Sequence, residues 1–278
     1  MSGEHPQGRQ GHGTVRLSRE EQHGKSIFID TTRCTACRGC QVACKQWHDH
    51  EAVPTKQTGT HQNPPDLTPN NFKLVRFSEH KIDGHVHWLF FPDQCRHCLQ
   101  PACKATADMY VEDAIVVDEA TGIVVCTEKT KELTKEQCDE IIDSCPYNIP
   151  RRNEISGELV KCDMCIDRVQ AGLVPMCVKS CCTGAMSFGE REDMLIKAKL
   201  RLTEAQAEIE RPKSELETKI VCDVHKSCTI LDEEDLGVIY FLEMPREMYH
   251  QYAGREIKPL NRADFLAGLA KPFKNMLG

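Results

Sequence analysis

Apolar residues follow two spacings along the chain, one typical of short strands and one typical of a helix. The alternating segment Ser26–Asp30 and short apolar runs at 87–91, 114–117, 123–125 and 237–242 predict strands. Between Met194 and Ile209, apolar residues recur every three or four positions with charged residues between them. We therefore expect several short strands, one long helix over 191–209 that ends before Pro212, and a last strand and short helix within 235–253.

Three polar segments lie outside these elements. Residues 1–25 are rich in Gly, His and Gln and offer little to bury, which predicts a flexible arm. Residues 51–71 contain four prolines and predict a long surface loop. Residues 261–278 are basic and amphipathic, and we expect them to form a docking tail.

Cysteine is the outlier in an otherwise ordinary composition. The chain has 17 cysteines among 278 residues, a richness typical of disulfides, zinc sites or iron–sulfur clusters. Cys-x2-Cys pairs begin at Cys34, Cys95 and Cys162, and each pair opens a longer group. Repetition of such a unit is typical of duplicated bacterial-type ferredoxins.

The first and last cysteine groups predict two [4Fe–4S] clusters that exchange their fourth ligands. A tight loop supplies three thiolates at spacings of three, and a fourth cysteine, four positions further on, points towards the partner cluster. The x2 spacings make poor disulfides, and four cysteines within 11 residues are too many for one zinc knuckle. The expected ligands are Cys34, Cys37, Cys40 and Cys181 for cluster 1, and Cys162, Cys165, Cys177 and Cys44 for cluster 2. Cys182 stands where such runs usually have proline, so the choice between Cys181 and Cys182 stays open.

The middle groups predict only one more cluster. Cluster 3 would use Cys95, Cys98, Cys103 and Cys145. A companion cluster would need cysteines at positions 107, 135, 138 and 141, of which only Cys138 is one. Random loss would scatter gaps over several clusters, whereas these gaps all fall on the same one. We therefore expect three [4Fe–4S] clusters on twelve of the cysteines.

The remaining cysteines and the aromatic residues have ordinary interpretations. Cys126 and Cys182 are expected to be small buried apolar residues, and Cys138 a remnant without metal. Cys222 and Cys228 would close a disulfide, bind a metal with His225, or do neither. Trp47 and Trp88 are expected in the core, and His97 is expected to pack or hydrogen-bond near a cluster rather than to bind iron.

Charge and hydropathy limit the partners. The net charge of -7 argues against a nucleic-acid partner. The best apolar run, Leu236–Leu242, is too short for a transmembrane segment, and residues 1–25 show neither an apolar signal core nor a twin-arginine pair.

Charged residues near the cysteine groups allow two interpretations. Residues 112–143 hold ten acidic side chains against three lysines, which predicts either a solvated face or a docking site for a basic acceptor such as a multihaem cytochrome c. Lys45, Lys161 and Arg168 adjoin cluster ligands, where they either favour the reduced cluster or are simply solvated.

The order of the cysteine groups resembles that of a known family. The segments CTACRGCQVACKQWH, CRHCLQPAC, CPYNIPR, KCDMCIDR and CVKSCCTGAMSFG follow one another within residues 26–189. They resemble the iron–sulfur (beta) subunit of molybdenum- or tungsten-dependent formate dehydrogenases, in the three-cluster form of sulfate-reducing bacteria. The resemblance covers about residues 26–278. Within the wider molybdopterin oxidoreductase superfamily, the missing ligands of a fourth cluster favour formate dehydrogenase.

The resemblance implies an α+β fold of two interleaved ferredoxin-like modules. Residues 26–92 with 148–189 would form the first module, with two clusters, and 93–147 the inserted second module, with one. Residues 190–278 would add a helix and a C-terminal extension that contacts another subunit.

By the same resemblance, the chain would not be an enzyme by itself. It would pass electrons from a catalytic alpha subunit, which holds a Mo- or W-bis-pterin centre, to an acceptor such as a c-type cytochrome. The family implies a periplasmic location after export together with the catalytic subunit, and the sequence is equally compatible with the cytoplasm.

Two further interpretations compete with this one. The chain could serve another molybdopterin oxidoreductase, of the polysulfide, thiosulfate or dimethyl sulfoxide reductase type, although those relatives usually keep four clusters. A zinc-binding structural protein is the alternative from a different class, and the distant fourth cysteines argue against it.

Overall fold

The computed structural model describes residues 24–82, 84–210, 228–231 and 235–254, which form a mixed α and β fold. The strands are β1 Lys25–Asp30, β2 Leu74–Ile82, β3 His85–Asp93, β4 Ile115–Val117, β5 Val124–Cys126, β6 Arg151–Arg152, β7 Leu159–Val160, β8 Met186–Glu190, β9 Thr229–Leu231 and β10 Val238–Leu242. The helices are α1 Gly39–Trp47, α2 Ala102–Ala107, α3 Lys135–Ser144, α4 Ile166–Gln170, α5 Met176–Lys179 and α6 Arg191–Glu210. Short 3₁₀ helices are η2 Thr31–Arg33, η3 Glu128–Glu132 and η4 Arg246–Met248.

Most local predictions from the sequence are confirmed. Every predicted strand is present, α6 matches the predicted long helix, and the predicted short helix near Tyr249 is η4. Residues 51–71 form the predicted loop, without a helix or a strand. The predictions for the arm up to residue 23, the docking tail and Cys222 concern residues outside the described ranges. None of the helices within those ranges has both the length and the apolar composition to cross a bilayer.

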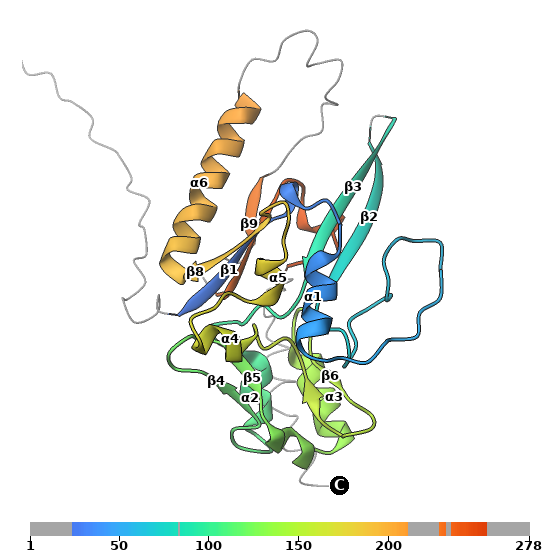
Figure 1. The fold of residues 1–278 in the computed structure, drawn as a ribbon, viewed down its shortest axis with the longest axis vertical. Coiled ribbons are helices and arrows are strands. Elements are labelled where there is room, and N and C mark those ends of the chain that lie inside the picture. Colours follow the sequence, from blue (N-terminus) through green and yellow to red (C-terminus); the bar gives the residue numbers. More distant parts are fainter. Residues whose placement is uncertain (1–23, 83, 211–227, 232–234, 255–278) are drawn as a thin grey trace, which may run out of the picture.

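A four-stranded sheet in the order β8-β1-β10-β9 organises the part of the molecule drawn uppermost in Figure 1. β1 pairs parallel with β10 and antiparallel with β8. Because side chains alternate across a sheet, Phe28 and Ile239 pack against α6, whereas Ile27 and Tyr240 lie in the core that contains Cys40. With both faces covered, every residue of β10 is buried.

The C-terminal strands are part of this sheet. β10 lies between β1 and β9, and the residues before it run along the loop of the second cysteine group. The N–H of Gly237 donates to the carbonyl of His97 at 3.0 Å, and the N–H of Leu99 donates to the carbonyl of Asp235 at 2.9 Å. Strand β10 of the 190–278 segment is thus built into the core, where the resemblance implied an extension for another subunit.

A second unit, drawn lowermost in Figure 1, contains α2, α3 and the hairpins β4–β5 and β6–β7. α2 packs against α3, which begins with a capping box between Thr134 and Gln137. Hairpin β2–β3 projects from the opposite end of the molecule. The predicted burial of the two tryptophans is wrong: Trp47 is 41% exposed and Trp88 is 46% exposed.

Asp93, at the end of β3, is the centre of a buried ion-pair network. Its carboxylate accepts hydrogen bonds from Arg76 at 2.6 Å and from Arg96 at 2.7 Å, and all three side chains are buried. The Arg96 guanidinium also lies 4.9 Å from the ring centroid of Tyr240. Burial alone would raise the pKa of Asp93, but the two guanidinium groups hold it below its ordinary value.

We predict that Asp93→Asn lowers the free energy of unfolding by about 3–5 kcal/mol, because it leaves two buried arginines without their shared counter-charge. Asp113→Asn is the matched control, since the Asp113 carboxylate is exposed and pairs with Lys129 at 3.5 Å. Its loss should change stability by less than about 1 kcal/mol. Thermal unfolding measures both, and equal melting temperatures for the two variants would contradict the prediction.

Candidate iron–sulfur sites

Each Cys-x2-Cys loop has its second intervening residue in the left-handed region. Ala36, His97 and Met164 have φ values of 52°, 46° and 56°. Non-glycine residues seldom adopt this conformation, so its recurrence at one position of three loops shows a shared local structure. The N–H groups of His97 and Met164 lie 3.4 Å from the sulfurs of Cys95 and Cys162 respectively. N–H groups that converge in this way form a nest for an anionic group.

Two short helices bring the first and last cysteine groups together. Cys40 and Cys44 lie one turn apart on α1, Cys177 lies on α5, and Cys181 follows α5. α1 packs against α5. Residues four positions apart share a helix face but differ in height by ~6 Å, so one helix can serve two neighbouring sites. This arrangement is compatible with the exchange of fourth cysteines that the spacing predicts.

Site 1 brings together Cys34, Cys37, Cys40 and Cys181. Burial raises the pKa of Cys40 to about 12, and repulsion from Cys34 and Cys181 adds to this rise. Burial would also raise the pKa of Cys181, but the Thr183 hydroxyl and nearby main-chain N–H groups lower it below its ordinary value. Cys181 is therefore the member of site 1 whose surroundings most favour a thiolate.

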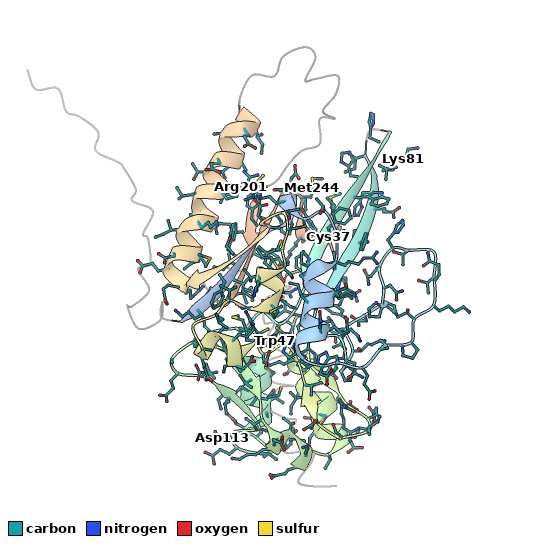
Figure 2. The ribbon with its side chains drawn as sticks, viewed as in Figure 1. Cys37, Trp47, Lys81, Asp113, Arg201 and Met244 are labelled. Atoms are coloured by element: carbon teal, nitrogen blue, oxygen red, sulfur yellow. The ribbon has the colours of Figure 1, made fainter. Side chains whose placement is uncertain are left out.

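Cys182 is exposed, so the prediction that it is buried is wrong. Its sulfur lies 3.8 Å from that of Cys37, which is also exposed. Cys182 thus borders site 1 from the solvent side, while Cys181 lies among hydrogen-bond donors. Figure 2 shows Cys37 beside the first turn of α1, where site 1 reaches the surface.

Site 2 brings together Cys162, Cys165, Cys177 and Cys44. Burial raises the pKa of all four thiols, and that of Cys165 reaches about 12. Cys162 is also raised by Cys95, a member of the third set, whereas Cys177 is raised by Cys181 of site 1. Site 2 therefore lies between site 1 and the third set.

Site 3 is a cavity between the 95–103 segment and the end of α3. Its walls include all four predicted ligands, Cys95, Cys98, Cys103 and Cys145, together with apolar residues such as Val124 and Ile149. Burial raises the pKa of Cys103 to about 12, with further repulsion from Cys95 and Cys145. The spacing of the cysteines in the sequence predicts that these four residues share one site. In the structure all four line the same cavity.

The position that a fourth cluster would need is filled with buried side chains. α2 and α3 pack as α1 and α5 do, so Ala107 corresponds to Cys44 and Ile141 to Cys177. Ala107, Cys138 and Ile141 are each 0% exposed and share one core. The space that two helices leave for a cluster in the first module is thus a closed core in the second.

The sets of thiols suit a group that carries positive metal ions. Buried thiols with a raised pKa stay protonated at neutral pH, and a bound metal ion reverses this by binding the thiolate. Each loop also points N–H groups at sulfur, as cubane clusters require from their surroundings. The residues of all three sites therefore fit [4Fe–4S] clusters.

One smaller group of metal-binding residue types occurs in the described part of the chain. His48, Asp163 and Cys165 have ligand atoms within 4.8 Å of one another. The Nε2 atom of His48 lies 2.9 Å from an Asp163 carboxylate oxygen. Because Cys165 belongs to site 2, this group is part of that site's surroundings and gives no separate support to a zinc protein.

Two buried lysines also lie among the cysteines, and the sequence analysis identified only one of them. Lys161 adjoins Cys162 in the sequence, and it is buried rather than solvated. Lys73 precedes β2, far in sequence from the cysteines, yet it lies beside Cys40 and Cys177. The sequence around it, FKLVRF, mixes apolar residues with two cations and gives no sign of this position.

The comparisons with known proteins agree with these sites. Residues 86–191 match the model of a 4Fe-4S dicluster domain. The chain is 50% identical over 229 residues to formate dehydrogenase subunit beta of Megalodesulfovibrio gigas, covering 82% of this chain and 98% of that protein. It is 51% identical over 231 residues to formate dehydrogenase 2 subunit beta (cytochrome c-553) of Nitratidesulfovibrio vulgaris, covering 83% and 98%. The nitrate-inducible formate dehydrogenase iron–sulfur subunit of Escherichia coli is 36% identical over 183 residues, 65% of this chain and 59% of that one.

The fold, the converging thiols and the domain match define an iron–sulfur protein of the ferredoxin-like 4Fe-4S class. Within that class, the extent and identity of the similarity place the chain more narrowly. It belongs to the family of formate dehydrogenase beta subunits, as the order of its cysteine groups indicated.

We predict that Gly237→Ala weakens site 3 through the main chain. A Cβ atom at Gly237 would lie 2.7 Å from the carbonyl oxygen of His97, so the 95–98 loop would have to move. Such overpacking costs about 1–3 kcal/mol and should reduce the iron retained on mild heating. Gly189→Ala is the control, because its nearest neighbour is the flexible end of Met194 at 3.2 Å. Equal iron loss from both variants would contradict the prediction.

Proposed function

We propose that the chain carries electrons through three [4Fe–4S] clusters, held at sites 1, 2 and 3 by the ligand sets defined above. The observation that carries this proposal is the contrast between the two helix pairs. α1 and α5 bring two sets of thiols together, whereas α2 and α3 supply one thiol to a site, Cys103, and close the remaining space with Ala107, Cys138 and Ile141. A bound cluster of this kind accepts and gives up one electron at a time.

The order of the sites along the molecule supports a linear path. Cys40 of site 1 adjoins Cys177 of site 2, and Cys162 of site 2 adjoins Cys95 of site 3. Oxidation of one formate to CO2 releases two electrons and one proton, so a path of one-electron carriers must accept the electrons singly and deliver them to two one-electron acceptors or to one acceptor twice. The chain's own residues fix the spacing and surroundings of the carriers.

The partners follow from the family. The relatives are named as beta subunits of formate dehydrogenases, so we propose a catalytic alpha subunit with a Mo- or W-bis-pterin centre, where formate is oxidised. Site 1 reaches the surface at Cys37 and Cys182, and this end is available for contact with the catalytic subunit. Service to another molybdopterin oxidoreductase is a weaker candidate, because the similar proteins named above all carry formate dehydrogenase names.

At the site 3 end of the path, the surface charge favours a cytochrome as the electron acceptor. One relative is named for cytochrome c-553. In this chain the acidic segment 112–143 includes most of α3, and α3 leads directly to Cys145 of site 3. All carboxylates of this segment except that of Asp118 are exposed. Figure 2 shows Asp113 at this end of the molecule. Lys129, Lys131 and Lys135 pair with only some of the carboxylates, so a net negative face remains.

Location and export are a separate part of the proposal. A c-type cytochrome acceptor would suit a periplasmic complex in which the chain is exported with its catalytic subunit. Cell fractionation tests this without reference to the clusters.

We predict that Cys181→Ser removes one cluster and that Cys182→Ser does not. Cys181 lies among hydrogen-bond donors that favour the thiolate, whereas Cys182 lies outside site 1. The iron content of the purified complex should fall by the equivalent of one cluster, about four iron atoms for each copy of this chain, for Cys181→Ser only. EPR of the reduced complex should show one signal fewer. Equal iron content in both variants would contradict the ligand assignment.

We predict that charge reversal on the acidic face slows electron transfer to a basic c-type cytochrome. Replacing Glu132, Glu136 and Asp143 with lysine should lower the second-order rate constant about tenfold or more at low salt and flatten its dependence on ionic strength. The control replaces the exposed Glu192, Asp193 and Glu204 of α6 with lysine. A wild-type rate that does not change with ionic strength would count against docking at this face.

A further inference from the structure

Lys73 and Lys161 are buried cations without a carboxylate partner among the described residues. Lys73 is 1% exposed and Lys161 is 5% exposed. The ammonium group of Lys73 donates to the side-chain oxygen of Gln94 and, at 3.3 Å, to the carbonyl of Pro92. That of Lys161 donates to the carbonyls of Val124 and Cys162. Within the described ranges neither lysine forms an ion pair, in contrast to Arg76 and Arg96, which share Asp93.

The two lysines occupy equivalent places between successive sites. The Gln94 oxygen that accepts from Lys73 also lies 4.0 Å from the sulfur of Cys177 in site 2, and Cys40 of site 1 is among the cysteines that act on Lys73. Lys161 lines the cavity of site 3 together with Cys95 and Cys103, and it donates to the carbonyl of Cys162 in site 2. There is thus one buried ammonium group at each of the two junctions of the path.

Cysteine sulfur supplies the counter-charge that the two ammonium groups do not receive from a carboxylate of the described residues. Burial by itself lowers the pKa of a lysine and favours its neutral form. For Lys73 and Lys161 this effect of burial is outweighed by the surrounding cysteine sulfurs, so the pKa of both ammonium groups is raised. Both ammonium groups thus face the cysteines of two sites rather than a carboxylate of the described residues.

Two buried N–H donors beside the lysines lack an acceptor in the described part of the chain. The Gln94 oxygen faces Lys73, which leaves its Nε2 group without a partner. His97 accepts a hydrogen bond at Nδ1 from the N–H of Val124 at 3.1 Å, so its proton is on Nε2, and that atom is also buried and unpartnered. Since buried donors are rarely left unpaired, they indicate acceptors that the protein itself does not supply, such as cluster sulfides.

We propose that Lys73 and Lys161 are shared counter-charges, each placed between two clusters so that both neighbours can hold an electron at the same time. This inference rests on the proposed function and goes beyond it. A reduced cluster carries one more negative charge than an oxidised one, so an electron on one cluster disfavours reduction of the next. A positive charge at the junction stabilises both reduced neighbours and offsets their repulsion in a region of low dielectric.

The consequence concerns the electron pair from formate. One oxidation event releases two electrons, which can both leave the catalytic centre before an acceptor arrives only if two carriers hold one electron each. A lysine between two adjacent sites allows the clusters at both sites to hold one electron each. Both lysines act as positioning residues through charge, and neither gains nor loses a proton or an electron in the process.

The test is a redox titration of the complete complex, followed by EPR, for Lys73→Met and Lys161→Met. In each variant two of the three midpoint potentials should fall, with an about tenfold lower ratio of reduced to oxidised cluster at a fixed potential, about 59 mV. Only the site 2 potential should fall in both variants, which identifies it. The magnetic coupling between two reduced neighbours should appear only at lower potentials than in the wild type.

The controls separate charge from structure. Lys73→Arg and Lys161→Arg keep the charge and should keep the wild-type potentials. Lys81→Met removes an exposed charge on hairpin β2–β3, at the position that Figure 2 labels, and should change none of the three potentials. Unchanged potentials in both methionine variants, or an equal fall of all three potentials, would overturn the inference.

Loss of iron would also be informative. If Lys73→Met does not retain its clusters, Lys73→Gln replaces it, because an amide can keep a hydrogen bond without the charge. Retention of iron by Lys73→Arg together with loss from both neutral variants supports a need for charge, whereas loss from Lys73→Arg as well overturns it. Iron content of the wild-type complex tests the proposed function separately: fewer than three clusters there refutes that proposal, while three clusters with unaltered variant potentials refute only this one.

Discussion

Burial of sulfur is the physical constraint on which this structure depends. The thiols of sites 1, 2 and 3 lie mostly in apolar surroundings, where burial raises the pKa of most of them and disfavours the thiolate. Only bound metal ions make the ionised form stable there. The loops around the sites therefore expose N–H groups to sulfur, and they accept left-handed residues at Ala36, His97 and Met164 to do so. The cofactors are in this sense part of the core, and the polypeptide is arranged around them.

Much of the candidate site could be predicted from the sequence because a cluster imposes a local spacing. Three ligands within one loop leave a readable pattern, and the helix that carries Cys40 and Cys44 fixes the direction of the fourth. The expectation of three clusters rather than four has the same basis, since the ligand positions of a fourth can be counted in the sequence. The structure adds that Ala107, Cys138 and Ile141 form a closed core where the fourth would lie.

The features that the sequence did not reveal all depend on contacts between distant segments. The partner of β10 could not be inferred from an apolar run, because β1 lies at the other end of the chain. Lys73 shows no cysteine beside it, and only folding brings it to Cys40 and Cys177. The exposure of Trp47, Trp88 and Cys182 was also missed, because residue type alone indicates burial and cannot show that a surface is left open.

The position of β10 also bears on the order of assembly. β10 is the central partner of β1, and the residues before it hold the loop that contains Cys95 and Cys98. During synthesis this strand leaves the ribosome after every cysteine of the three sites, so the sheet cannot close while the ligand loops are emerging. The loop that contains Cys95 and Cys98 therefore stays without its covering strand until β10 has been synthesised.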